Sequence, residues 1–196
     1  MSEHTPRILA FAASLRTGSY NKRLVRVAAE AVRVAGAVVT LVELNDYPMP
    51  IFNEDDESAH GLPETAKALK KLFVEHDGFL LASPEYNSSF TPLFKNTIDW
   101  VSRTEAPHEP ALVAFSGKTA ALLSASPGGL GGIRGLVHVR SILSNIGVVV
   151  LPKQVSIPDA SDAFNLDGAL TDASKQQSVE GLARQFVELT RKLAVR

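Results

Sequence analysis

The stretch RILAFAASLRTGSYNKRLVRVAAEAVRVA, residues 7–35, decides the fold class of this chain. Residues 8–13 form a continuous apolar run with the length of a buried strand, and apolar residues then recur at helical spacing from Leu24 to Ala35. A strand that leads directly into a helix places the loop between them, residues 14–21, at the carboxyl edge of a parallel sheet. Open α/β folds bind their ligands at that edge.

The rest of the chain repeats this alternation of strand and helix. It indicates parallel strands joined by right-handed crossovers, and hence a three-layer α/β fold with helices on both faces of one sheet. The expected strands are residues 7–13, 37–43, 79–83, 119–124 and 148–151, and the expected later helices are residues 62–76, 91–103, 132–145 and 174–195.

Two stretches lack this periodicity. Residues 45–60 combine an apolar part, which could line a pocket or a subunit contact, with an acidic run that we expect to be solvated. Residues 152–171 contain Pro158 and Gly168, and they predict a surface excursion near the carboxyl edge of the sheet.

Length and composition limit the classes of partner. The 196 residues fit one domain, residues 1–196, and a net charge of -1 gives no long-range attraction to nucleic acid or to anionic lipid. The N-terminus lacks a targeting pattern and no apolar run has the length of a membrane span, so we expect a cytoplasmic protein without a membrane partner. The chain has no Cys and its five His residues lack zinc-site spacing, so no metal site is expected.

The residues of the first loop, 14–21, suit an anion. The loop lies where backbone amides are exposed at a helix N-terminus, Ser14, Ser19 and Asn21 add polar side chains, and Arg16 adds charged donors. The expected ligand group is a phosphate. The alternative is that Ser19 or Asn21 only caps the helix and that Arg16 is a solvated charge.

Two segments match other nucleotide-binding motifs only in part. Residues 116–119, SGKT, end like a P-loop, but Leu112 stands where the earlier glycine belongs and a strand follows instead of a helix. Residues 129–134, GLGGIR, resemble a dinucleotide fingerprint, but Arg134 replaces its last glycine. A stably held NAD of the Rossmann type is therefore not expected.

Two further loops follow predicted strands at the same edge. The second loop is PEYN, residues 84–87, and the third loop is SPGG, residues 126–129. Glycines in the third loop would let a flat ligand approach the backbone, and Tyr86 offers an aromatic face. Taken singly, each loop could also be an ordinary turn, and the glycines could serve only a positive φ.

These segments together resemble the NADPH-dependent FMN reductase family. The resemblance rests on SLRTGSYN (14–21), on PEYN (84–87) continuing through Pro92, Lys95-Asn96 and Ile98-Asp99-Trp100, and on SPGG (126–129). It implies a flavodoxin-like fold with strand order 2-1-3-4-5, FMN as cofactor, and NADPH or NADH as a transient hydride donor. It also implies quinones, azo compounds or similar electron-poor small molecules as acceptors, and a homodimer or homotetramer.

The resemblance also implies the residues around FMN. The first loop would wrap the phosphate, with Arg16, Ser19 and Asn21 as side-chain contacts, and the other loops would border the isoalloxazine ring. The implied cofactor-binding residues are Ser14, Leu15, Arg16, Thr17, Gly18, Ser19, Tyr20, Asn21, Pro84, Glu85, Tyr86, Asn87, Ser126 and Gly128. Lys95, Asn96, Asp99 and Trp100 would serve helix packing or subunit contact.

Because flavin supplies the reactive atoms, no side chain is expected to be catalytic. Hydride would pass from NAD(P)H to flavin N5 and then to the acceptor, in ping-pong fashion, and Arg103 and Arg134 are candidates for a contact to the NADPH phosphate. Two other functions stay open at this point: a flavodoxin-type electron carrier, which the near-neutral charge speaks against, and a flavin-free sensor or interaction module.

Overall fold

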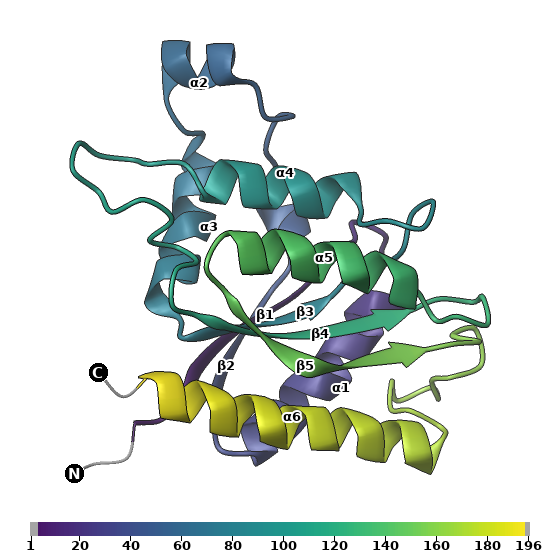
Figure 1. Cartoon of the computed structure of the whole chain (residues 1–196). Coiled ribbons are helices and arrows are strands. Elements are labelled where there is room, and N and C mark those ends of the chain that lie inside the picture. The colour runs from purple at the N-terminus through teal and green to yellow at the C-terminus, as the bar shows by residue number, and fades with distance from the viewer. Residues whose placement is uncertain (1–3, 195–196) are drawn as a thin grey trace.

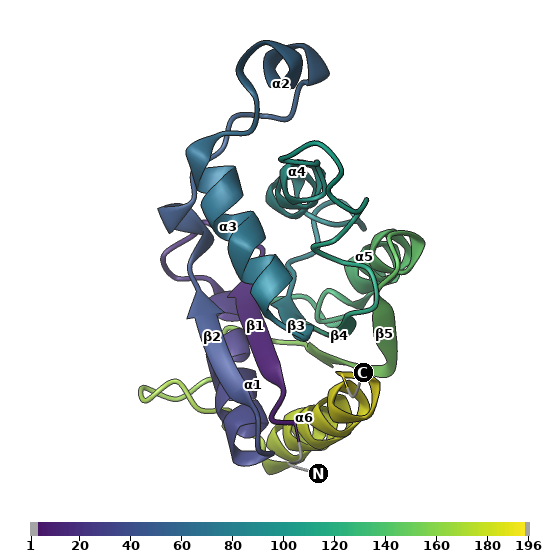
Figure 2. The ribbon, with the colours of Figure 1, turned by 90° about the vertical axis from the view of Figure 1, so that its left-hand side faces the viewer.

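A single parallel sheet organises the fold in a computed structural model that describes residues 4–194. Its strands lie in the order β2-β1-β3-β4-β5, as expected, and Figure 2 shows this order from the side. All neighbouring strands pair in parallel. The strands are β1 (Arg7–Ala12), β2 (Val38–Val42), β3 (Gly78–Ala82), β4 (Thr119–Ala125) and β5 (Val149–Ile157).

Helices cover both faces of the sheet, which confirms the three-layer prediction. Two helices, α1 and α6, lie on one face, and α3, α4 and α5 lie on the other (Figures 1 and 2). Their bounds are α1 (Tyr20–Val34), α3 (Glu64–Glu75), α4 (Pro92–Val101), α5 (Ile133–Asn145) and α6 (Ala173–Ala194). The last helix was predicted to reach Val195, which lies outside the described residues. Among residues 4–194, every helix is too short or too polar to span a lipid bilayer.

The core has two layers because successive strand residues face opposite sides of the sheet. In β1, Ile8, Ala10 and Ala12 pack toward α1 and α6, whereas Leu9 and Phe11 pack toward the other three helices. A strand buried on both faces reads as a continuous apolar run, which is why residues 8–13 predicted it directly.

The prediction for β5 was too short. Residues 148–151 were expected to form a strand, but β5 extends through Ile157, so the surface excursion begins only at Pro158. Pro152 hid this extension because it cannot donate to a strand ladder. It is tolerated because the pairing register with β4 shifts here, from Ala120↔Val150 to Leu122↔Gln154. Arg140 on α5 donates to the carbonyls of Leu151 (2.8 Å) and Pro152 (3.2 Å) at this irregularity.

Residues 45–60 are more ordered than their lack of periodicity suggested. They overlap a short 3₁₀ helix, η1 (Leu44–Asp46), and contain a helix, α2 (Glu54–His60), that stands away from the sheet (Figure 2). The Asn53 side chain accepts a hydrogen bond from the Asp55 amide at 3.0 Å, which caps α2. The acidic run forms the first turn of α2, where the helix dipole favours negative charge. No residue of α2 is buried, and this explains why its sequence shows no periodic pattern of apolar residues.

Candidate functional site

The three loops singled out from the sequence meet at the carboxyl ends of β1, β3 and β4. A cavity of about 130 Å³ lies between them. Residues of all three loops line it: Ser14, Arg16, Ser19, Tyr20 and Asn21 from the first, Pro84, Glu85 and Tyr86 from the second, and Ser126 and Pro127 with the adjacent Ala125 from the third.

The start of α1 offers several unpaired backbone donors. Its N-cap residue, Ser19, makes no side-chain cap hydrogen bond, which contradicts the alternative in which Ser19 only caps the helix. Within the described chain, the amides of Arg16, Thr17 and Gly18 and those of residues 20–22 have no hydrogen-bond acceptor, and the first helical bond runs from Arg23 to Ser19. The Arg16 side chain is exposed and forms no ion pair with any of residues 4–194. These donors converge where the helix dipole also favours an anion.

Asn21 differs in role from the other polar residues of the first loop. The residue is buried, with only 3% of its surface exposed. It donates to the Ala125 carbonyl at 2.8 Å and accepts from the Ala125 amide at 3.0 Å. Asn21 therefore ties the start of α1 to the end of β4, and this places the first loop beside the third. A contact from Asn21 to a phosphate stays a prediction.

Glu85 joins the second loop to the start of α5. Its carboxylate accepts hydrogen bonds from Arg134 Nε (2.8 Å), from the Arg134 amide (3.0 Å) and from the Gly135 amide (3.3 Å). Burial raises the pKa of the Glu85 carboxyl, but the hydrogen bonds from Arg134 and Gly135 outweigh it and hold the pKa below its ordinary value. Glu85 thus serves as a negatively charged cap for α5, because the N-cap residue of this helix, Gly132, has no side chain that could cap it.

The second loop continues into a tight two-residue turn. Tyr86 and Ser89 exchange backbone hydrogen bonds of 2.9 and 3.0 Å, and between them Asn87 and Ser88 have φ of 49° and 66°. Two consecutive residues in the left-handed region are typical of a type I′ turn, which fits Asn at the first position. The turn leaves Tyr86 48% exposed at the cavity rim, and Asn87 does not line the cavity.

The glycines after β4 have different reasons to be glycine. Gly131 (φ +62°) and Gly132 (φ +87°) have a left-handed backbone that favours glycine, and a Cβ at Gly131 would also lie only 2.7 Å from the backbone nitrogen of Pro158. Gly128 has no positive φ, and a Cβ there would meet only Ser126 Oγ, at 3.8 Å. No contact within residues 4–194 requires glycine at position 128, and the space that a larger side chain would occupy there is open.

Not every predicted residue borders the cavity. Leu15, Thr17, Gly18, Asn87 and Gly128 belong to the right loops but do not line it. Ala125 and Pro127, which do, were not predicted; their position next to Ser126 was the only signal for them in the sequence.

The remaining motif residues pack the protein together, as the sequence suggested. Asn96 accepts from the Phe52 amide at 2.7 Å and donates to the Pro50 carbonyl at 2.9 Å, to which Trp100 Nε1 also donates at 2.8 Å. Lys95 pairs with Asp99 one helical turn away.

The two arginines considered for NADPH are both paired. Arg134 bonds to Glu85 beside the cavity, and 57% of its side chain is exposed. Arg103 lies just after the end of α4, where it pairs with Glu57 of α2 at 2.8 Å and lies over the Phe52 ring.

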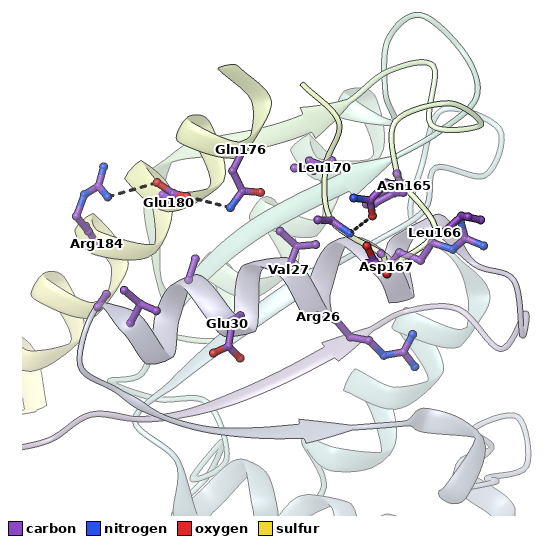
Figure 3. Close-up of a pocket in the computed structure, with 17 residues that line it drawn as sticks. Arg26, Val27, Glu30, Asn165, Leu166, Asp167, Leu170, Gln176, Glu180 and Arg184 are labelled. Atoms are coloured by element: carbon purple, nitrogen blue, oxygen red, sulfur yellow. Dashed lines mark hydrogen bonds and ion pairs between the residues drawn. The ribbon is translucent and has the colours of Figure 1, made fainter. Parts of the chain in front are cut away.

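A larger cavity, of about 1030 Å³, has no residue of the second or third loop in its lining. Figure 3 shows the residues that line it. The cavity runs between α1, α6 and residues 164–170, and its charged lining mixes three arginines with Glu30, Asp167 and Glu180, so it favours neither sign of ligand charge. Tyr20, at the small cavity, stacks on Phe164, at the large one, with ring centroids 6.5 Å apart. None of the residues predicted to bind a cofactor lines this larger space.

The donors around the small cavity fit the phosphate of a flavin mononucleotide. Uncapped helix amides, two serine hydroxyls and an arginine without a carboxylate partner form a donor set suited to a dianion. Comparison with known proteins agrees with this chemistry: the model of the NADPH-dependent FMN reductase family matches residues 6–162. The chain belongs to this family.

Similar proteins extend the match over nearly the whole chain. An NAD(P)H-dependent FMN reductase of Pseudomonas aeruginosa is 35% identical over 175 residues, which cover 89% of each chain. An NAD(P)H:quinone oxidoreductase of Solanum tuberosum is 34% identical and covers 95% of this chain and 94% of its own. Among solved structures, a flavoenzyme NAD(P)H:(acceptor) oxidoreductase of Paracoccus denitrificans superposes with a TM-score of 0.79 at 26% identity, covering 96% of this chain and 98% of that one. This FMN reductase family member is thus an oxidoreductase that uses FMN, with NAD(P)H as hydride donor.

Proposed function

We propose that this reductase passes electrons from NAD(P)H to quinones or similar electron-poor small molecules, with FMN bound where the three loops meet. The observation that carries the proposal is the uncapped start of α1, whose amides lie beside Ser14, Ser19 and the unpaired Arg16. The quinone reductase names of several relatives support the class of acceptor.

Each loop has a separate task in this proposal. The first loop and the first turn of α1 bind the FMN phosphate through backbone amides, the Ser14 and Ser19 hydroxyls and the Arg16 guanidinium. Pro84, Glu85 and Tyr86 flank the ring from the second loop, and Ser126 and Gly128 border it from the third. The side chains of Asn21 and Glu85 form hydrogen bonds with backbone groups of other segments, and these bonds hold the loops in place relative to one another.

FMN, when bound, supplies the redox chemistry, since it accepts a hydride from NAD(P)H and gives electrons to the acceptor. The protein's part is to hold the ring with one face open, so that donor and acceptor can occupy the same place in turn. Backbone donors of the second and third loops stabilise negative charge on the ring without rearranging. Arg134 is the better placed of the two candidates for the NADPH phosphate, because it lies beside the cavity and more than half of its side chain is exposed.

The oligomeric state belongs to the same proposal. Apolar side chains are exposed close to the site: Tyr86 (48%), Leu130 (54%), Ile133 (38%) and Val137 (57%). A second copy of the chain packed on this surface would cover them and complete the walls of the site. We therefore expect a homodimer or homotetramer that Val137→Glu converts to smaller species, as measured by sedimentation velocity.

The test of the proposed function is an anaerobic titration followed by visible absorption. The protein is reconstituted with FMN, and NADPH and then a quinone are added in turn. Bleaching by NADPH and recovery with the quinone would support the proposal. Bound flavin that NADPH does not bleach would indicate an electron carrier instead, and failure to bind FMN would overturn the proposal.

A further inference from the structure

A buried ammonium group lies behind the first loop. Lys22, in the first turn of α1, is only 5% exposed. Its Nζ lies 2.9 Å from Glu43 Oε1 and donates a longer hydrogen bond, of 3.4 Å, to the carbonyl oxygen of Leu15. This cation therefore contacts the backbone of the first loop from inside the protein.

A second side chain binds the same carbonyl from another element. Asn45, in η1, donates from Nδ2 to the Leu15 oxygen at 3.2 Å. Glu43, just after β2, connects the two donors, because its carboxylate pairs with Lys22 and also accepts a hydrogen bond from the backbone amide of Asn45 at 3.4 Å. Two side chains from two segments of the chain thus hold one peptide carbonyl, and Glu43 supports both of them.

The orientation of that carbonyl fixes the amide next to it. In a trans peptide the C=O and the N–H point in opposite directions, and the described chain contains no cis peptide bond. When Lys22 and Asn45 hold the Leu15 oxygen, the Arg16 N–H points away from them. That amide has no acceptor among residues 4–194.

We propose that Lys22, Glu43 and Asn45 form a lock on the Leu15–Arg16 peptide that aims the Arg16 amide at the FMN phosphate. This inference rests on the proposed function, since it assumes that the first loop binds the phosphate. The three residues are positioning residues, because none of them lines the cavity between the loops. Without the lock the peptide can rotate and present its carbonyl oxygen to the anion, which would repel it.

The test compares two ligands that differ only in the phosphate. Dissociation constants for FMN and riboflavin are measured by quenching of flavin fluorescence in the full-length protein. Asn45→Ala should weaken FMN binding about fivefold, because it removes one neutral hydrogen bond from the lock. Lys22→Met should weaken it tenfold or more, because it also leaves the Glu43 carboxylate unpaired near the anion. Riboflavin affinity should change by less than about twofold in both.

Matched variants control for folding and for net charge. Lys192→Met removes an exposed lysine that pairs with Glu188 on α6, and it should leave both affinities unchanged. Because Asn45 is exposed, Asn45→Ala should fold even if Lys22→Met does not. The melting temperature of each flavin-free variant checks this.

Three outcomes would count against the lock. Equal losses for FMN and riboflavin would show a general structural role and overturn it. No change in either affinity, while Arg16→Ala still weakens FMN binding, would overturn the lock and leave the proposed function standing. A wild-type protein that does not prefer FMN over riboflavin would overturn the phosphate site itself, and the lock with it.

Discussion

The polar side chains around the first loop divide, residue by residue, into two groups. Asn21 and Lys22 are buried and bonded to backbone groups of the protein. Arg16 is exposed and has no partner within the described chain. Polar groups that form no bond within the protein are the ones available to a ligand. This distinction separates residues of the first loop that the sequence motif alone does not distinguish.

Replacement of Arg16 tests that distinction directly. Arg16→Ala should weaken FMN binding by about 1.5 to 3 kcal/mol, the range for a hydrogen bond to a charged group, and should leave the melting temperature of the flavin-free protein unchanged. Isothermal titration with FMN, and with riboflavin as the phosphate-free control, measures the difference. An unchanged FMN affinity would remove Arg16 from the site.

The two kinds of glycine after β4 predict opposite outcomes. Gly128→Val should fold normally, because a Cβ there meets only Ser126 Oγ at 3.8 Å, but it should weaken flavin binding on the order of tenfold by crowding the ring. Gly131→Val should instead destabilise the fold by about 1 to 3 kcal/mol, because it forces a branched residue into positive φ against Pro158. Thermal melting and flavin titration of both variants separate the effects. Normal flavin affinity in Gly128→Val would refute the placement of the ring.

Among the elements, α5 is capped by a residue far away in sequence. Its N-terminal amides are capped by Glu85 from the second loop, so the packing of this helix and the shape of the cavity are linked. Glu85→Gln should lower the free energy of unfolding by about 1 to 3 kcal/mol, because a carboxamide cannot accept from all three donors and carries no charge. Chemical denaturation at pH 7 measures this, with Glu188→Gln on the exposed side of α6 as a control that should change little.

The same cap has a defined pH dependence. Because the folded-state pKa of Glu85 is lowered, its stabilisation is present above the ordinary carboxyl value of 4.5 and is lost as the pH falls through the lowered pKa. The difference in stability between wild type and Glu85→Gln should therefore shrink below about pH 4. A difference that stays constant with pH would contradict a charged cap.

Elements with strong local patterns could be predicted from the sequence. The apolar strands and the amphipathic helices can be recognised from their hydrophobic patterns. The positions of the loops at the sheet edge follow from the order of these elements. The missed elements have physical reasons: Pro152 interrupts β5 at a register shift, and α2 buries nothing that could produce a period. Within the site, the bond from Asn45 to Leu15 spans 30 residues, and no local pattern indicates such a contact.

For the molecule as a whole, His76 couples stability to pH at the contact between α3 and the edge strand β2. It is 2% exposed, and its ring lies between the Leu72 carbonyl (2.6 Å) and the Thr40 hydroxyl (2.7 Å). Burial lowers the pKa of His76, and Arg7 and Lys118 lower it further, against the opposing effects of the Leu72 carbonyl and of Glu75. The unfolded chain therefore binds a proton at higher pH than the folded one.

This difference predicts a loss of stability in mild acid. The contribution of His76 to the free energy of unfolding should not change with pH above its ordinary pKa of 6.5. It should then fall by at most about 1.4 kcal/mol per pH unit as the pH drops toward the lowered value. Denaturation curves between pH 7.5 and about pH 5 measure the slope, and His76→Gln should flatten it. A His76→Gln protein with the wild-type slope would exclude His76 as its source.

Helix α2 contributes to neither core layer, and the Glu57–Arg103 ion pair is its main bond to the body. We therefore expect selection for folding to act only weakly on its seven residues. Insertions or deletions between Asn53 and Gly61 should accumulate during evolution more readily than at the strand-end loops. For the engineer, the same segment is the natural place to graft a tag or a fluorophore without disturbing the sheet.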